Sequence, residues 1–335
     1  MNPCRSFSIP AFLKSCRPMF WLAAFLLLCG SGCVSGTRPA PQVIFDTDIS
    51  SDVDDVGAVA VLHALADRNE VGILAMAVSS GDPWSVPCLH ALNAWFGRED
   101  IPVGKAREPA VTHESLYTMK IVEEFGGQST VERPSEDAVD LYRRILASQP
   151  DGSVTIVTVG YLTNLADLLH SSADSYSNME GHALVRQKVK RLVCMGGEFP
   201  SGREWNLYQD AVSTKAVVDG WPTPIVFCGF EIGKDIMTGA DLRKGGKDNP
   251  VRRSYELYNA VQNRQSWDQV TVLYAVRMAG DPDDPTFAMQ PGKIMVSDDG
   301  TNSWQAGEPA LQAYLKLRIP AGELASDIEQ LMTAR

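Results

Sequence analysis

The stretch 42–65 constrains the fold of this chain more than any other, because an apolar run leads directly into a dense group of aspartates and then into a second apolar pattern. The run Val43–Phe45 is typical of a strand covered on both faces, and the apolar residues of 56–65 are typical of the buried side of a helix. Open α/β sheets bind their ligands at the carboxyl ends of parallel strands. The stretch therefore predicts strand, acidic loop and helix, with five carboxylates gathered at the end of the strand: Asp46, Asp48, Asp52, Asp54 and Asp55.

Three explanations of these aspartates differ in how many carboxylates they use. Asp54 or Asp55 can cap the following helix, where the helix dipole favours a negative charge. The others can belong to a solvated acidic loop. A cap accounts for one carboxylate, whereas crowded like charges raise one another's pKa or require a counter-ion. Clustered hard oxygen ligands suit Ca²⁺ or Mg²⁺, so the pattern favours a metal site.

The amino-terminal segment has the features of an export signal. Residues 1–32 carry three basic residues and no acidic one, followed by an apolar run at 19–29 that is too short to span a membrane comfortably. The sequence Gly-Ser-Gly-Cys at 30–33 resembles the lipobox of bacterial lipoproteins, although glycine stands where leucine is usual. Both lipidation of Cys33 and plain cleavage before it remain open. We expect an exported protein, periplasmic or anchored to the membrane as a lipoprotein, with 33–41 as a short tether.

The mature chain is acidic, which bears on its partners. Removing the three basic residues of the signal takes the formal net charge from -11 to -14. A nucleic acid is therefore not expected as a partner. The length left is enough for one sizeable core, so residues 42–335 are expected to form one α/β domain. We interpret the remaining cysteines of the domain as buried small apolar residues and not as a disulfide framework; they are Cys88, Cys194 and Cys228. The sequence leaves the oligomeric state open, including a homo-oligomer.

Strand and helix patterns alternate along the domain. Strands are expected near 71–77, 101–104, 154–159, 189–194 and 224–228, and helices near 85–96, 138–148, 164–169, 211–218, 251–263, 270–278 and 323–332. Residues 105–134 are expected to form a loop with some helix around 114–125, residues 171–182 a polar excursion, and the segments 293–296 and 314–319 an antiparallel edge. His63, on the helix after the aspartates, is interpreted as a core or helix-face histidine and not as a ligand.

Five motifs follow one another along the mature chain. They are the strand-linked aspartates Asp46, Asp48, Asp54 and Asp55, the sequence Gly-Tyr-Leu-Thr-Asn at 160–164, the turn Met-Gly-Gly at 195–197, the segment Glu-Trp-Asn at 204–206 with Asp210, and Asp268. In this order they resemble the inosine-uridine-preferring nucleoside hydrolase family. The resemblance spans nearly all of the mature chain, and the ordered set is far more specific than any one motif. It implies an open α/β fold whose mostly parallel central sheet has helices on both faces, a bound Ca²⁺, and hydrolysis of the N-glycosidic bond of a ribonucleoside or related riboside.

The resemblance also implies roles for single residues. Asp48 matches the aspartate that contacts the metal and takes the proton of the attacking water, and Asp54 matches the one that holds the ribose hydroxyls. The implied metal ligands are Asp48, Asp55, Asp268 and the backbone carbonyl of Val159. The implied contacts to the ribose are Glu204, Asn206 and Met195.

Three departures from the family pattern qualify these roles. Five residues separate Asp48 from Asp54 where three are usual, so Asp52 lies in an enlarged loop and can replace or assist a ligand. Asp82 and Trp267 are also expected to contact the substrate, but both depart from the usual residue. Asp82 stands where many relatives carry asparagine. Trp267 precedes Asp268 where a histidine is thought to protonate the departing base in other members, and tryptophan cannot act as a general acid. Another group protonates the base, or the leaving group needs no acid, or the substrate is not an ordinary nucleoside.

Two other functions are compatible with parts of the sequence. A haloacid-dehalogenase-like phosphatase is suggested by Phe-Asp-Thr-Asp at 45–48 and by the acidic segment 280–284, but Ser50 stands where that family needs threonine or valine. A non-catalytic, lipid-anchored riboside-binding protein is suggested by Trp267, although the candidate base Asp48 is in place.

Overall fold

A computed structural model describes residues 39–335 except 128–129, 131–132, 280, 282 and 308–310. The predicted signal peptide, Cys33 and most of the tether lie outside the described residues. Residues Pro39–Arg335 form one compact unit. Within the described residues no helix combines the length and the apolar character that crossing a membrane requires.

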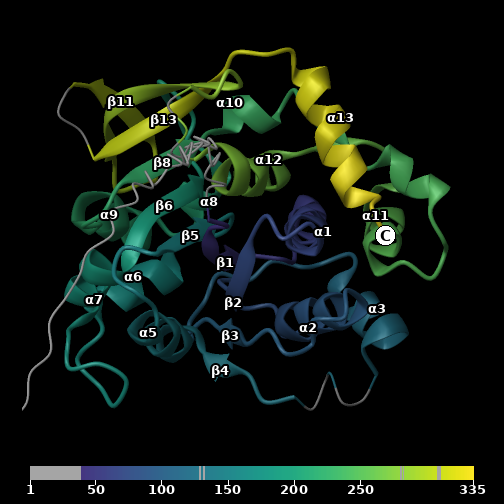
Figure 1. The fold of residues 1–335 in the computed structure, drawn as a ribbon, viewed down its shortest axis with the longest axis horizontal. Helices are drawn as coiled ribbons and strands as arrows, with labels where there is room; N and C mark the ends of the chain where they lie inside the picture. The colour runs from purple at the N-terminus through teal and green to yellow at the C-terminus, as the bar shows by residue number, and fades with distance from the viewer. Residues whose placement is uncertain (1–38, 128–129, 131–132, 280, 282, 308–310) are drawn as a thin grey trace, which may run out of the picture. The chain divides into compact units, whose positions relative to one another are not determined.

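A mostly parallel sheet forms the centre of this unit, as the resemblance implied (Figure 1). Its strand order is β4-β3-β2-β1-β5-β6-β8-β13-β11-β12-β7. Neighbours from β4 to β13 run parallel, and those from β13 to β7 run antiparallel. The strands are β1 (Gln42–Thr47), β2 (Gly72–Val78), β3 (Val103–Lys105), β4 (Glu136–Asp137), β5 (Val154–Thr158), β6 (Val189–Met195), β7 (Ser201–Gly202), β8 (Ile225–Cys228), β11 (Phe287–Val296), β12 (Asn302–Ala306) and β13 (Gln312–Leu317).

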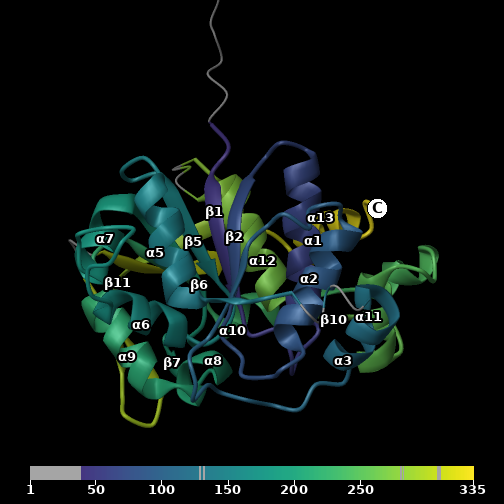
Figure 2. The same cartoon turned by 90° about the horizontal axis from the view of Figure 1, so that it is seen from below.

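Helices cover both faces of the sheet, because its central strands are apolar on both sides (Figure 2). On one face lie α5 (Ala138–Ser148), α6 (Thr163–His170), α7 (Gly181–Lys188) and α9 (Ala211–Gly220). On the other lie α1 (Asp54–Asp67), α2 (Ser85–Trp95), α12 (Trp267–Leu273) and α13 (Ala321–Met332). Shorter or more peripheral elements are α3 (Thr118–Ile121), η1 (Val122–Gly126), α8 (Trp205–Gln209), α10 (Phe230–Gly233), η2 (Ala240–Lys244), α11 (Pro250–Asn259), η3 (Tyr274–Met278) and the small hairpin β9 (Met237–Thr238) with β10 (Arg264–Gln265).

The alternation of side chains along β1 connects two separate cores. Phe45 belongs to the cluster beneath α1 and α12, whereas Ile44 belongs to the cluster beneath α5 and α6. Both side chains are fully buried. Because burial on both faces fixes the register of β1, the position of the loop that follows this strand is fixed as well.

Some expected elements differ from those observed. The segment 314–319 was expected at an antiparallel edge, but β13 lies inside the sheet, parallel to β8 and antiparallel to β11. Helix α7 was not predicted, since its sequence carries only a weak apolar stripe between polar residues. The three cysteines of the domain are free and buried, as predicted. His63 is also buried: its Nε2 lies 2.8 Å from Asn93 Oδ1, and burial lowers its pKa to about 4.

Candidate active site

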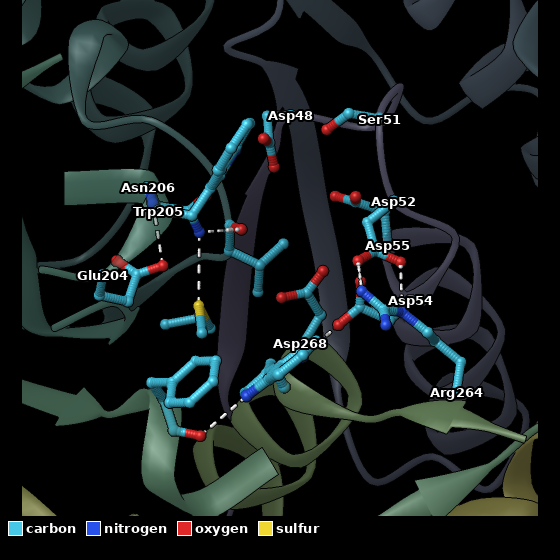
Figure 3. Close-up of a pocket in the computed structure, with 14 residues that line it drawn as sticks. Asp48, Ser51, Asp52, Asp54, Asp55, Glu204, Trp205, Asn206, Arg264 and Asp268 are labelled. Carbon is cyan, nitrogen blue, oxygen red and sulfur yellow. Dashed lines mark hydrogen bonds and ion pairs between the residues drawn. The ribbon is translucent and has the colours of Figure 1, made fainter. Parts of the chain in front are cut away.

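The carboxyl ends of four neighbouring parallel strands, together with the first turns of α8 and α12, surround a cavity of about 330 Å³ (Figure 3). This volume is within the range of small-molecule sites. Its lining joins acidic, amide and aromatic side chains: Asp48, Ser51, Asp52, Asp54, Asp55, Val159, Met195, Glu204, Trp205, Asn206, Phe230, Arg264, Trp267 and Asp268. Glu204 and Asn206 lie across the cavity from Asp54 and Arg264.

Three buried aspartates form the most crowded part of the cavity wall. Asp54 and Asp55 open helix α1, and Asp268 comes from the first turn of α12, which packs beside it. One carboxylate oxygen of each lies within 4.8 Å of the others. The backbone N–H of Asp268 donates to Asp54 Oδ2 at 3.3 Å, and the hydroxyl of Thr47 donates to Asp55 Oδ1. These bonds fix carboxylates from distant parts of the chain around one point.

The charge of this triad requires compensation. Burial raises the pKa of Asp54, Asp55 and Asp268 well above the ordinary value, and repulsion between the carboxylates raises it further. Either the carboxyl groups hold protons or a cation sits among them. A set of hard oxygen donors at this spacing fits a divalent cation, so the residues present can hold a metal.

Asp48 lies directly after β1, in a confined position. Burial raises its pKa to about 7, although a contact from the Tyr161 hydroxyl opposes this increase. Gly160 packs against it so closely that an added Cβ would lie 2.5 Å from the Asp48 backbone nitrogen. A carboxylate with a pKa near neutrality, at the wall of a cavity, is suited to accept a proton from a bound molecule.

Asp46 does not join this group, contrary to the prediction that all five aspartates gather together. Its Oδ2 accepts hydrogen bonds from Tyr142 Oη at 2.8 Å and from Asn164 Nδ2 at 3.0 Å, both on the opposite face of the sheet from α1. Burial raises its pKa to about 7. The alternation of β1 directs this side chain away from the cavity, so Asp46 supports the structure beneath the site.

The opposite wall is built on the first turn of α8. Glu204 caps this helix: it accepts from the backbone N–H groups of Asn206 at 2.8 Å and Leu207 at 3.1 Å, and also from Gly197 at 3.2 Å. The side-chain amide of Asn206 donates to the Val159 carbonyl at 2.9 Å and contacts the Met195 sulfur at 3.4 Å. The cap holds Asn206 in position, while both side chains still line the cavity.

Two aromatic rings form a further wall. Phe230 and Trp267 stack with ring centroids 5.3 Å apart and an interplanar angle of 24°. The indole Nε1–H of Trp267 donates to the Phe230 carbonyl at 2.8 Å, which fixes the ring. This apolar surface beside a carboxylate cluster can accept a flat, weakly polar group.

Asp52, in the enlarged loop, is held by an arginine. Arg264 donates from Nε to Asp52 Oδ1 at 3.0 Å and from Nη2 to Oδ2, while the Tyr117 hydroxyl donates to the Asp52 carbonyl at 2.6 Å. The carboxylate of Asp52 is therefore neutralised by a protein cation, whereas the triad is not.

The structure brings nearly all of the predicted site residues to one cavity. Besides Asp46, Asp82 lies outside the cavity: its Oδ2 accepts from Ser85 Oγ at 3.1 Å and from Thr118 Oγ1 at 2.9 Å, so it supports a neighbouring loop. Of the acidic segment 280–284, residues 280 and 282 lie outside the described residues. Sequence reasoning missed four lining residues, Ser51, Trp205, Phe230 and Arg264. Phe230 could have been found, because it follows the buried strand β8 by two residues and thus lies at the edge of the sheet where ligands bind.

Comparison with known proteins gives a consistent result. Residues 43–315 match the family model described as inosine-uridine preferring nucleoside hydrolase. The pyrimidine-specific ribonucleoside hydrolase RihA of Photobacterium profundum is 28% identical over 227 residues, which are 62% of this chain and 67% of that protein. A protein of Schizosaccharomyces pombe is 27% identical over 214 residues, or 59% of this chain and 64% of its own length. These curated relatives are thus matched over about two thirds of their length.

Similarity in three dimensions extends further than similarity in sequence. A plant nucleoside hydrolase, the PpNRh1 enzyme, superposes with a TM-score of 0.68 at 19% identity, covering 89% of this chain and 100% of that one. At this identity the superposition shows a shared fold.

Proposed function

The chain belongs to the inosine-uridine preferring nucleoside hydrolase family, and on this premise we propose that it hydrolyses the N-glycosidic bond of a ribonucleoside or related riboside, releasing the base and ribose. The observation that carries the proposal is the composition of the cavity: a confined carboxylate, a buried acidic triad and an aromatic wall face the same space. Each has a use in breaking a bond between a sugar and a flat base.

We propose Ca²⁺ as the cation of this site, held by Asp48, Asp55, Asp268 and the Val159 carbonyl. Asp55 and Asp268 belong to the buried triad, whereas Asp48 lies outside it and the third triad member, Asp54, is assigned to the ribose. Val159 follows the carboxyl end of β5 and lines the same cavity as these carboxylates. Only hard oxygen atoms are offered, which suits Ca²⁺. When bound, the cation would lower the pKa of water and attract the ribose hydroxyls.

The protein residues activate the attacking water and bind the sugar. Asp48 takes the proton of the attacking water, since it is the confined carboxylate whose pKa lies near neutrality. Asp54, Glu204 and Asn206 hold ribose hydroxyls, with Met195 against the sugar. The sugar becomes positively charged as the bond breaks, and the surrounding carboxylates stabilise that charge.

The base belongs against Trp267 and Phe230. Neither ring carries a proton that it can give to the departing base. The candidate base Asp48 is present, which supports hydrolysis over riboside binding alone. Position 267 has no histidine, so a non-catalytic riboside-binding protein is the alternative to be tested. The phosphatase alternative has less support, because its nucleophile would be Asp46, which is buried on the other side of β1.

A panel of ribosides tests the proposal. Release of ribose from uridine, cytidine, inosine, adenosine and nicotinamide riboside is measured with and without chelator, beside phosphate release from p-nitrophenyl phosphate. We expect chelator-sensitive ribose release from at least one riboside and no phosphate release. Binding of ribosides by calorimetry without any turnover would instead identify a binding protein.

We also propose that the mature protein is exported, either periplasmic or held at the membrane through Cys33. The support is the basic and apolar leader in 1–32. Cell fractionation of the wild type and of Cys33→Ser tests this. Recovery of the intact precursor from cytosol contradicts export, and equal release of both proteins into the soluble fraction contradicts the anchor.

A further inference from the structure

Arg264 is the only cationic side chain among the described residues that line the cavity, and six carboxylates line the same cavity. It comes from the short strand β10 and lies three residues before Trp267 in the chain. Its guanidinium carbon lies 5.1 Å from the centroid of the Trp267 ring and 5.7 Å from that of Tyr258. The positive charge is thus placed beside the aromatic wall, where the proposed function locates the base.

Hydrogen bonds fix the guanidinium but do not occupy all of its N–H groups. Its Nε and Nη2 donate to Asp52, and its Nη1 donates to Gln265 Oε1 at 2.8 Å. A guanidinium has five N–H groups, so each terminal nitrogen keeps one more. No acceptor among the described residues contacts these two donors. With a side chain 27% exposed, Arg264 can present them to a molecule in the cavity.

The aromatic wall and the guanidinium beside it carry no proton that they can give to the departing base. Phe230 and Trp267 have no such proton, and the arginine keeps its own at any physiological pH. A hydrogen-bond donor with a fixed charge can nevertheless stabilise a negative charge that develops on a leaving group.

We propose that Arg264, positioned by Asp52, binds the leaving group of the riboside and stabilises it as an anion. This inference rests on the proposed function. The bond from C1′ to the base nitrogen breaks, and its electron pair stays on the base. Water adds to C1′ and gives its proton to Asp48, while the base anion takes a proton from solvent after release. The substrates are therefore ribosides whose base spreads negative charge onto an oxygen or nitrogen atom that faces the guanidinium.

Two substrates with different leaving groups separate this role from a structural one. The leaving group of p-nitrophenyl β-D-ribofuranoside is a stable anion that needs little help, whereas the anion of uracil or hypoxanthine needs more. Arg264→Gln should lower kcat/KM for uridine or inosine by roughly 10- to 100-fold, the range for a hydrogen bond to a charged group, and that for the nitrophenyl riboside by less than about threefold. Arg264→Lys, which keeps the charge, should retain more nucleoside activity than Arg264→Gln.

The Arg277–Glu70 pair provides a matched control. It is also bidentate, and its side chains are 29% and 31% exposed, against 27% and 26% for the Arg264–Asp52 pair. It does not line the cavity. Arg277→Gln should therefore change thermal stability to a similar degree while leaving the ratio of the two activities unchanged.

Each result decides the inference. An equal loss on both substrates in Arg264→Gln, no loss on either, or a lysine variant no better than glutamine overturns the role of Arg264 while the proposed function stands. Wild-type protein that hydrolyses the nitrophenyl riboside but no nucleoside also overturns it. Wild-type protein that hydrolyses neither refutes the proposed function, and the inference fails with it.

Discussion

The side-chain amide of Asn206 donates a hydrogen bond of 2.9 Å to the backbone carbonyl of Val159, the same oxygen that we propose as a metal ligand. A carbonyl oxygen has two lone pairs, so one remains for a cation. The bond joins the first turn of α8 to the end of β5 across the cavity floor. The wall that carries Glu204 and Asn206 is therefore joined to the proposed metal site through this one buried carbonyl oxygen.

Asn206→Asp should destabilise the protein more than Asn206→Ala. Aspartate replaces the amide donor with a second oxygen that faces the Val159 carbonyl, and a buried acceptor without a donor costs roughly 1–3 kcal/mol. Alanine removes the contact without adding a charge. Urea unfolding of both variants measures the difference, and equal midpoints would show that a second oxygen facing the Val159 carbonyl adds no cost.

Purified protein should contain one divalent cation, with Ca²⁺ restoring any thermal stability that chelator removes. Binding to the folded state alone raises stability by an amount that grows with the ratio of free ion to Kd. Metal analysis and thermal unfolding test this in the wild type and in two variants. Asp268→Asn should lose the ion, whereas Asp46→Asn, which changes a buried aspartate facing away from the triad, should keep it. The proposed site would be contradicted if the purified protein held no stoichiometric ion and added Ca²⁺ did not raise the Tm.

Asp48 and Asp54 should differ in which kinetic constant they affect. Asp48→Asn keeps an oxygen atom but loses the base, so kcat on the best riboside should fall by roughly 10²-fold or more with KM little changed. Asp54→Ala removes an acceptor for ribose hydroxyls, so KM should rise as well. Steady-state kinetics distinguish the two. Wild-type turnover in Asp48→Asn would refute the hydrolytic mechanism.

Asp46 should make the folded state less stable as the pH rises. Burial raises its pKa to about 7, above the ordinary value of 3.8, so the folded protein binds the extra proton between these values. The stability that this proton provides is complete below about pH 4 and is lost as the pH rises through about 7. The Tm of Asp46→Asn relative to wild type should therefore increase over this range and then level off.

Thermal unfolding in chelator measures this trend, because cation occupancy then does not vary with pH. The exposed Glu99→Gln serves as the control for the loss of one carboxylate. A Tm difference for Asp46→Asn that does not vary with pH would show that Asp46 is charged throughout.

The parts of the fold that sequence predicted well have strong local signals. Helix α5 was expected at 138–148 and is observed there, since the Asp137 side chain caps it through the backbone N–H groups of Val139 and Asp140. Asp46 was misplaced because nearness in sequence grouped it with the other aspartates, whereas it still lies within β1, which ends at Thr47, and its side chain faces α5 and α6.

The part of the site that was not predicted from the sequence has no comparable local pattern. Arg264 lies in a strand of two residues, too short for any apolar period, and its role depends on an ion pair with Asp52 that spans 212 positions of sequence. The aspartates of 46–55 were found because they are close in sequence, and Asp268 and Trp267 were found through the family resemblance. The contacts that Phe230 and Arg264 make with Trp267 and Asp52 form only in three dimensions.

The placement of β1 between β2 and β5 has a consequence for the order of folding. The first strand of the domain pairs with one neighbour near it in sequence and with another that begins at Val154, while Asp268 reaches the triad from still later in the chain. Contacts between distant segments require long loops to close and tend to form slowly. The acidic pocket cannot exist in a partly synthesised or half-folded chain. Affinity for a divalent cation should consequently appear only at the end of refolding, which makes it a kinetic marker for completion of the native state.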